Sequence, residues 1–242
     1  MPSAVSDEVA VLLLADTAPA SLLWGWSNMV RGPRALRGTP GLRFAKLLGS
    51  GFEGGFGLRP SKSRQGLFAV FSNAAAADAF ADDSALVAAY QTRCTELCTV
   101  KMRPCASRGS WDGNALSPSA SHPAAGPIAA LTRASIRLRL APAFWRYAPA
   151  AQHAIDSAAG CRLAVGLGEA PFLRQATFSI WDDVAAMDAY ARSGAHLDAI
   201  RAAQHKHYFS ESLFARFVVL GMRGTWKGRT YASEPQFAHG LA

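Results

Sequence analysis

The residues best suited to chemistry in this chain are histidines near its C-terminal end. His196, His205 and His207 lie in the stretch SGAHLDAIRAAQHKHYFSES, residues 193–212, and the spacing of its apolar residues predicts a helix. The neutral imidazole nitrogen is a favoured metal ligand, for haem iron in particular. The question is which of the three side chains faces a site.

His196 differs from the other two in its surroundings. Ser193 and Gly194 interrupt the helix, and a serine cap at that point puts His196 in the first turn of a new helical segment. Small and apolar residues then follow on one helical face and lead to His207: Ala199, Ile200 and Ala203. Small residues beside an imidazole leave room for a large, flat ligand, so His196 is the candidate ligand. His205 points off this face.

An internal repeat allows the histidine positions to be compared with equivalent positions in the first half of the chain. GLRFAKLLGSG in the first half of the chain matches GCRLAVGLGEA in the second, and LFAVFSNAAAADAFA matches TFSIWDDVAAMDAYA. In this alignment His196 takes the place of Leu86. A duplicated fold keeps its core pattern in both copies, so a position that turns polar in one copy indicates function. The alternative is a histidine that is exposed or hydrogen-bonded within the core.

Each half reads as strand, helix, strand, strand, helix, strand, which is the βαββαβ order of a ferredoxin-like unit. The expected elements cover residues 9–15, 21–36, 42–48, 66–72, 74–90 and 95–103, and then 128–138, 144–158, 162–168, 175–182, 184–207 and 213–220. One such sheet leaves a face bare, and two halves cover those faces by packing together. The expected fold class is therefore α+β, a pseudo-dimeric α+β barrel with a cavity between the sheets or between sheet and helices.

The two halves are expected to be joined by a linker and followed by a tail. The first half covers residues 1–105, and a segment rich in Ser, Pro, Gly and Ala predicts the linker at 106–126. The second half, which carries the candidate site, covers 127–226. The tail covers 227–242.

Charge and composition narrow the classes of function. The formal net charge is +8, but Lys and Arg are scattered and no reading motif occurs, so no nucleic-acid partner is expected. A basic surface also suits anionic lipid or an acidic ligand. No apolar run reaches the length of a membrane span, and the N-terminus carries acids where a signal peptide would be basic, so a cytoplasmic location is expected.

Other motifs add little chemistry. The glycine-rich stretch GSGFEGGFG, residues 49–57, lacks the ending of a phosphate loop and predicts a loop over a cavity or a long hairpin connection. The four cysteines form no CxxC pair and are expected to be reduced thiols, although Cys94 and Cys98 at helical spacing leave a metal site as the alternative. His207 and Glu211 are the candidates for a catalytic role. The alternatives are the polar end of a helix for His207 and a solvated cap for Glu211.

Two long stretches resemble the spheroidene monooxygenase family, the carotenoid ketolases of phototrophic bacteria. They are TPGLRFAKLLGSGFEGGF from Thr39 and GEAPFLRQATFSIWDDVAAMDAYARSGAHLDAIRAAQHKHYFSESLFARFVVLGMRGTW from Gly168, and the resemblance runs from about Val9 to Trp226. It implies an oxidoreductase, a haem-dependent monooxygenase that inserts oxygen at an allylic CH2 of an acyclic carotenoid. Molecular oxygen, an apolar small molecule and a ferredoxin-type electron donor are the implied partners.

The resemblance also implies the site. More distant relatives with this barrel hold haem by a histidine on the second helix of a half, and His196 lies on the corresponding helix, so it is the expected iron ligand of haem b. Arg43, Lys46 and Arg162 on the repeated strand are the candidates for the haem propionates, with solvated strand-edge charge as the alternative. Relatives of this fold also carry out dehydration, peroxidation or haem degradation. A haem enzyme with non-oxygenase chemistry and a non-catalytic haem- or pigment-binding barrel are the alternative functions.

One expected helix has a composition that suits contact with a membrane surface. SLLWGWSNMVRGPRALRG, residues 21–38, is aromatic and basic enough to lie on a lipid surface, which would place the enzyme peripherally at the inner face of the membrane. Contact of this kind would let it take up a lipophilic substrate. The alternative is a buried helix, and the recurrence of Trp26 as Trp145 in the second half favours burial.

Overall fold

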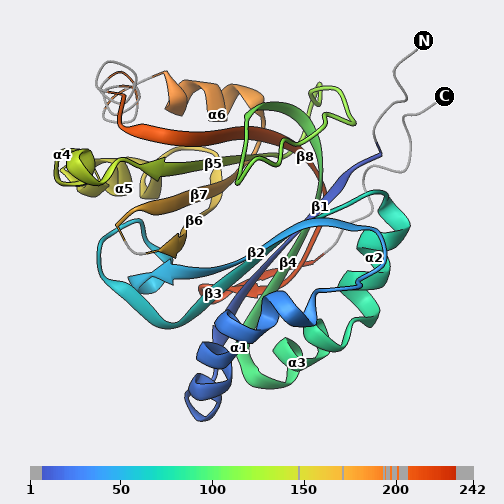
Figure 1. Ribbon diagram of the computed structural model, residues 1–242. Coiled ribbons are helices and arrows are strands. Elements are labelled where there is room, and N and C mark those ends of the chain that lie inside the picture. The colour runs from blue at the N-terminus through green and yellow to red at the C-terminus, as the bar shows by residue number, and fades with distance from the viewer. Residues whose placement is uncertain are drawn as a thin grey trace.

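The chain folds as two consecutive βαββαβ halves whose strands pair antiparallel throughout (Figure 1). The computed structural model describes residues 7–146, 148–170, 172–192, 194, 197, 201 and 207–232. Within each half the strands take the order 4-1-3-2 of a ferredoxin-like sheet. The predicted α+β fold with two ferredoxin-like halves is confirmed.

The first half follows the predicted order with one added break. Its elements are β1 (Val9–Thr17), η1 (Pro19–Ser21), α1 (Leu22–Ala35), β2 (Leu42–Gly51), η2 (Phe52–Gly54), β3 (Pro60–Phe71), α2 (Ala74–Asp83), α3 (Ala85–Arg93) and β4 (Cys94–Gly109). The single helix predicted over 74–90 is wrong. Ser84 takes an extended conformation, and its Oγ accepts a hydrogen bond of 3.2 Å from the Val87 N–H, which starts α3.

The second half repeats the order and its helices are also interrupted. Its elements are β5 (Ile128–Ile136), η3 (Leu138–Leu140), α4 (Ala141–Trp145), α5 (Ala148–Asp156), β6 (Cys161–Ala170), β7 (Arg174–Trp181), α6 (Val184–Ala191), β8 (Phe209–Trp226) and β9 (Arg229–Tyr231). The helix predicted over 144–158 is thus two helices. α6 ends at Ala191, so the helix expected over 184–207 is interrupted after that residue. Gly194 has φ +54°, and Leu197 and Arg201 are helical.

The eight long strands close into a barrel through two unequal contacts between the halves. β4 and β8 pair at eleven positions, whereas β2 and β6 pair only at Gly49 with Gly168 and Ser50 with Leu167. The Ser50 Oγ also donates a hydrogen bond of 2.7 Å to the Gly166 carbonyl. This short contact, named here the β2–β6 seam, is the less continuous side of the barrel wall.

The barrel interior is packed with apolar side chains. Alternate residues of every long strand point inward, among them Leu12, Phe68, Val100, Phe178 and Phe217. Two tryptophans belong to the same core: Trp111, from the segment interpreted as linker, and Trp226, at the far end of β8. β4 itself runs on to Gly109, and β9 lies within the segment interpreted as tail.

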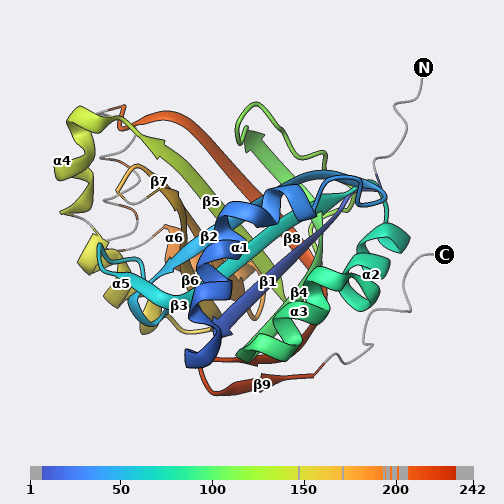
Figure 2. The same cartoon turned by 60° about the horizontal axis from the view of Figure 1, so that its bottom comes forward.

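Helices cover the outer faces of the two half-sheets. α1, α2 and α3 form one layer over β1 to β4, while α4, α5 and α6 lie against the second half-sheet (Figure 2). None of the described helices combines the length and the apolar character needed to cross a bilayer.

Candidate active site

A cavity of about 440 Å³ lies between the outer face of the second half-sheet and its helices. Outward-facing residues of β5, β7 and β8 line its floor: Ala130, Thr132, Gln175, Thr177, Ser179, Phe214 and Arg216. Residues of the helices form its other walls: Phe144, Trp145, Ile155, Met187 and Tyr190. Pockets for small molecules and cofactors typically have volumes of about 300–1,000 Å³, so this cavity is large enough for such a ligand. Of the two places expected for a cavity, the structure has it between sheet and helices.

The cavity exists because the repeat changes residue type on this face. Val9 pairs with Phe71 in the first half and Ile128 pairs with Trp181 in the second, so the two ladders have the same register. The four central positions in the first half are apolar and at most 1% exposed: Val11, Leu13, Leu67 and Ala69. Their second-half counterparts are smaller or polar: Ala130, Thr132, Thr177 and Ser179. Helices therefore pack directly onto the first sheet, where a hollow of about 530 Å³ lies among α1, α2 and α3 and is not lined by any strand residue. Over the second sheet the cavity reaches the strands themselves.

Cationic and polar groups stand at the edges of the cavity. Arg216 on β8 forms an ion pair of 2.9 Å with Asp188 on α6. The Arg108 guanidinium lies 5.4 Å from the centre of the Phe214 ring. Ser107 also borders the cavity, and its Oγ is buried without a hydrogen-bond partner in the described part of the chain. The cavity therefore offers apolar walls with cations at its margin.

The glycine-rich loop folds over the edge of this cavity. Phe56 lines it, and the Phe56 N–H donates a hydrogen bond to the Gln152 side chain of α5. A Cβ atom on Gly166 would lie 2.3 Å from the Gly55 carbonyl oxygen, so the loop approaches β6 as closely as glycine allows. The stretch fits both interpretations, since it connects the antiparallel strands β2 and β3 and also borders the cavity.

Of the three histidines in residues 193–212, His207 is among the described residues. His196 and His205 lie outside the described residues. Leu86, the first-half counterpart of His196, packs against the core between sheet and helices. His207 has φ +48°, is exposed, and its carbonyl accepts a hydrogen bond of 3.1 Å from Arg137 Nε. It does not line the cavity.

The three cations expected near the propionates are engaged elsewhere. Arg43 pairs with Glu8 at 3.1 Å, and Arg162 pairs with Asp182. Lys46 points into the barrel. None of the three lines the cavity, whose described cations are Arg108 and Arg216.

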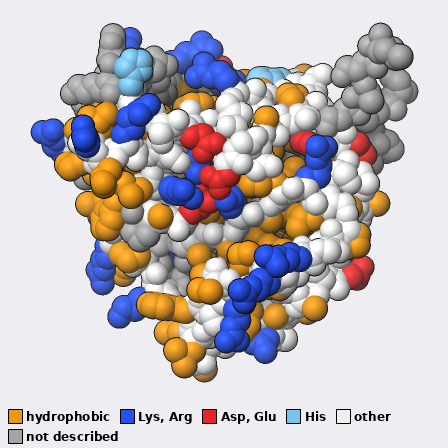
Figure 3. All heavy atoms as spheres, in the orientation of Figure 1, with side chains coloured by type: hydrophobic (Ala, Val, Ile, Leu, Met, Phe, Trp, Pro, Cys, Tyr) orange, Lys and Arg blue, Asp and Glu red, His pale blue; other side chains and the backbone are white. Residues whose placement is uncertain are grey.

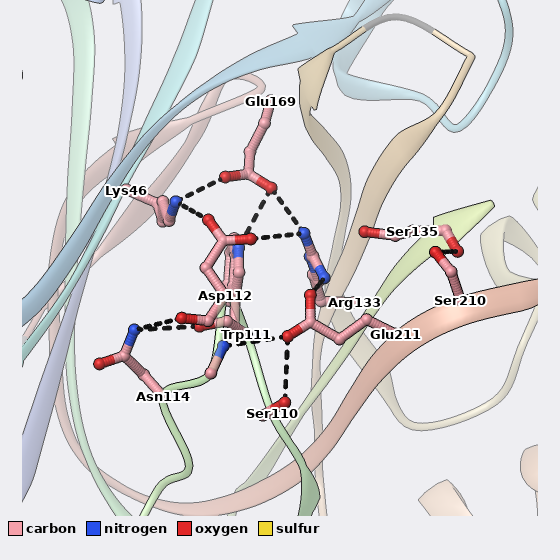
Figure 4. Close-up of polar contacts among 11 residues, drawn as sticks. Lys46, Ser110, Trp111, Asp112, Asn114, Arg133, Ser135, Glu169, Ser210 and Glu211 are labelled. Carbon is pink, nitrogen blue, oxygen red and sulfur yellow. Dashed lines mark hydrogen bonds and ion pairs between the residues drawn. The ribbon is translucent and has the colours of Figure 1, made fainter. Parts of the chain in front are cut away.

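A second group of charged residues fills one end of the barrel (Figure 4). Arg133 is only 1% exposed and pairs with Glu169 at 3.0 Å and with Glu211. Lys46 pairs with Glu169 at 2.9 Å and with Asp112, and the Trp111 Nε1–H donates to Glu169 at 3.1 Å. These residues, named here the barrel-end network, bring together Lys46 and Glu211, which the sequence put in separate roles.

The ionisation of the barrel-end network shows that its charges are mutually satisfied. Burial alone would lower the pKa of Lys46, but hydrogen bonds to Asp112 and Glu169 raise it above its usual value. Burial would raise the pKa of Glu211, yet hydrogen bonds from the Gly113 N–H, Arg133 and Ser110 lower it to about 2. Lys46 and Glu211 are therefore both charged near neutral pH. The barrel-end network therefore holds the barrel end closed, and the cavity is the candidate active site.

The sequence interpretation missed Trp111, Asp112, Arg133 and Glu169. The alternation of side chains along a strand could have indicated two of them, Arg133 and Glu169. Ala129, Leu131 and Arg133 lie on one face of β5, and the first two belong to the barrel core. Glu169 follows Leu167 on β6 in the same way. Trp111 and Asp112 come from an irregular segment, where no periodicity points to burial.

The cysteines are free thiols in the structure. Cys94 and Cys98 lie on β4 and not on a helix, so the helical spacing behind the alternative of a metal site is absent. Burial raises the pKa of the Cys94 thiol to about 11 and that of Cys98 to about 12, so both stay neutral at pH 7. Within the described ranges, no group of three or more His, Cys, Asp or Glu residues is placed to hold a metal ion.

Comparison with known proteins agrees with this architecture. The fold and the cavity define a two-half α+β barrel protein with a pocket outside the barrel. A crystal structure of aldoxime dehydratase in complex with butyraldoxime matches 90% of this chain and 81% of its own with a TM-score of 0.58 and 10% identity, which shows the shared fold. No protein-family model matches the chain.

Sequence relatives identify the family. Spheroidene monooxygenase of Rubrivivax gelatinosus is 60% identical over 224 residues, which cover 93% of this chain and 87% of that protein. Spheroidene monooxygenase of Rhodobacter capsulatus is 36% identical, with 87% of this chain and 89% of that protein covered. The chain belongs to the spheroidene monooxygenase family, a family of oxygenases.

Proposed function

We propose that the chain is a haem-dependent monooxygenase that oxidises an acyclic carotenoid in the cavity of the second half. The observation that carries the proposal is the cavity itself, which lies on the one sheet face where the repeat replaces apolar core residues by Ala, Thr and Ser. Its apolar walls suit a polyene, and relatives that cover most of the chain are named for spheroidene. Molecular oxygen and a ferredoxin-type electron donor are part of the same proposal.

The residues around the cavity fit haem b. A porphyrin is flat and apolar with two carboxylates at one edge, and the cavity combines apolar walls with Arg108 and Arg216 at its margin. We assign the carboxylates to these two arginines because both border the cavity. Arg43, Lys46 and Arg162 do not line it. Haem, when bound, supplies an iron centre that activates oxygen once reduced.

His196 is the proposed iron ligand, and the repeat supports it. Leu86 is half-buried on α3, where it packs against the core and borders the hollow among the first-half helices, so the same position in the second half would face the cavity. A neutral imidazole nitrogen can bind iron from there. Phe56, Phe144 and Trp145 line the cavity and would exclude water from the reacting carbon.

The spectrum of the haem-supplied protein tests the ligand. The wild type is expected to show a Soret band that is lost in His196→Ala and kept in the matched variants His205→Ala and His207→Ala. An unchanged band in His196→Ala would remove His196 as the ligand. Loss of the band in all three would indicate a general effect of altering this segment.

Turnover tests the reaction class. With an acyclic carotenoid, a reductant and oxygen, we expect an oxygenated product, and none when oxygen is withheld. Product formed without oxygen would assign the chain to non-oxygenase haem chemistry. Bound haem or pigment without turnover under either condition would assign it to a binding barrel.

A further inference from the structure

The exposed large hydrophobic side chains of the described residues all lie on elements that flank the β2–β6 seam. There are seven: Leu23, Trp26 and Val30 on α1, Phe52 and Leu58 in the β2–β3 connection, Leu138 in η3 and Phe172 in the β6–β7 turn. Four segments contain them: residues 22–37, 52–62, 137–146 and 172–174. These segments are named here the seam face. Scattered exposed apolar residues are normal, but seven gathered on one side indicate an interaction surface.

Hydrogen bonds join these segments in two pairs, and a third bond runs from one pair to α5. α1 packs on β2 and β3, and the Trp26 Nε1–H donates to the Lys62 carbonyl at 2.9 Å. The Trp145 Nε1–H of α4 donates to the Phe172 carbonyl at 2.9 Å. The β2–β3 connection bonds to α5 through Phe56. Figure 3 shows hydrophobic side chains interspersed with Lys and Arg along the left flank and lower part of the molecule, where α4, the β2–β3 connection and α1 lie in Figure 1.

α1 is inverted relative to an ordinary surface helix. Its large apolar residues point outward at spacings of three and four: Leu23 (88% exposed), Trp26 (61%) and Val30 (78%). Its fully buried residues are small or polar, Gly25, Asn28 and Gly32, and the half-buried Trp24 and Met29 pack against the core at the edges of this inner face. The burial of Trp26 that the sequence favoured is therefore wrong. A helix bordered by water is expected to show the opposite arrangement, so its outer face suits an apolar environment.

The four segments of the seam face account for the whole net formal charge of the chain. Its segments contain nine Lys and Arg and one acid, Glu53: three cations in 22–37, two in 52–62, three in 137–146 and one in 172–174. The rest of the chain has sixteen Lys and Arg and sixteen Asp and Glu, so the net charge of +8 resides here. All nine cations are exposed, and none forms an ion pair with another described residue. Elsewhere, cations such as Arg64 and Arg223 are paired with acids.

We propose that the seam face docks the protein on a lipid bilayer that contains anionic headgroups. The apolar ridge of α1 enters the boundary between headgroups and acyl chains, and the unpaired cations contact lipid phosphates. The inference goes beyond the proposed function, and docking itself does not depend on it. The exposed apolar ridge of α1, bordered by unpaired cations, fits the boundary between headgroups and acyl chains of such a bilayer.

Docking in this orientation brings the cavity next to the lipid. Phe56, Phe144 and Trp145 line the cavity, and all three belong to the segments of the seam face. A lipophilic substrate would then pass from the bilayer to the cavity without crossing water. This last step rests on the proposed function.

Vesicle sedimentation with the purified full chain tests the docking. We expect binding to vesicles of phosphatidylcholine mixed with phosphatidylglycerol, weak binding to phosphatidylcholine alone, and release by added salt because headgroup attraction is screened. Quenching of tryptophan fluorescence by brominated lipid is expected in the wild type and should decrease in Trp26→Phe.

Two sets of variants separate the charge from the apolar ridge. Arg31→Gln with Arg34→Gln and Arg37→Gln should weaken binding by about 100-fold, at roughly fivefold for each cation near an anionic surface. The matched control changes the charge equally at exposed sites outside the seam face, Arg192→Gln, Arg223→Gln and Arg229→Gln, and should keep most of the binding. Leu23→Ser with Trp26→Ser and Val30→Ser should weaken binding by about tenfold or more.

Three results would overturn the proposal. The first is equal binding to both kinds of vesicle or to neither, and the second is an equal loss in the control set and in the α1 arginine set. The third is a stable dimer in solution that the Leu23, Trp26 and Val30 substitutions dissolve, which would make a second copy of the chain the occupant. If the serine variant fails to fold, the arginine set still decides. None of these measurements needs turnover, so their failure leaves the proposed reaction untouched.

Discussion

The two halves share one fold, and they differ in what lies between sheet and helices. In the first half Leu13 and Leu67 pair across β1 and β3 and are covered by helices. In the second half Thr132 and Thr177 take the same places on β5 and β7 and line a cavity. The backbone register is unchanged, so a change of a few side chains converts a structural core into a pocket. Duplication thus leaves one copy to stabilise the fold and frees the other to bind a ligand.

The two halves also differ inside the barrel, where a buried apolar residue of the first half corresponds to a buried charged residue of the second. Leu14 on β1 is buried in the apolar core, and the ladder register puts Arg133 at the same position on β5. We expect Arg133→Leu to lower the free energy of unfolding by about 3–5 kcal/mol, because Glu169 and Glu211 would be left in the barrel without their cation. Denaturant unfolding measures this.

A matched exposed pair provides the control for Arg133. Arg162 and Asp182 are both about half exposed, so Arg162→Leu should change the free energy of unfolding by less than about 1 kcal/mol. Equal stability of Arg133→Leu and the wild type would show that the barrel-end network does not hold the barrel end.

The outer sheet faces yield a second pair of variants. Leu13 is 1% exposed beneath helices, and Leu13→Ala should cost about 2–5 kcal/mol of stability, since it leaves a hole in a packed core. Thr132→Ala, its counterpart in the second half, should cost less than about 1 kcal/mol because the side chain already borders a cavity. Similar losses for the two would mean that the second sheet face is packed as tightly as the first.

The pH dependence of unfolding tests the barrel-end network more finely. The pKa of Glu211 is about 2 in the folded protein against an ordinary value of 4.5, so the folded state binds this proton more weakly than the unfolded chain. The stability that the ionised Glu211 contributes is complete above about pH 4.5 and is lost as the pH falls toward 2. Glu211→Gln should remove this part of the acid sensitivity, and an unchanged slope between those pH values would contradict the assignment.

The fold could be predicted from the sequence because the two halves share a recognisable pattern of glycine, apolar and aromatic residues. The matched stretches around Gly41 and Gly160 locate equivalent strands, and two ferredoxin-like halves follow from their order. The helix break at Ser84 was not predicted, because a serine within an apolar periodicity shows its capping role only once the chain turns there.

Less of the candidate site could be predicted from the sequence. Arg43, Lys46 and Arg162 look alike as strand cations, and only the three-dimensional structure shows Lys46 inside the barrel and the other two in surface ion pairs. Arg108 and Arg216 reach the cavity from strands whose register depends on pairing between the halves. Pairing of that kind is a long-range property that one sequence does not display. The role of His196 stays a prediction.

We propose above that the cavity over the second half-sheet is the pocket of the enzyme. Thr132→Leu with Thr177→Leu gives this face the pair found at Leu13 and Leu67 in the first half and fills the cavity from its floor. We expect this double variant to fold, with a thermal unfolding midpoint at or above that of the wild type, and no longer to take up haem or oxidise a carotenoid. A folded double variant with full haem uptake and full turnover would contradict the proposal.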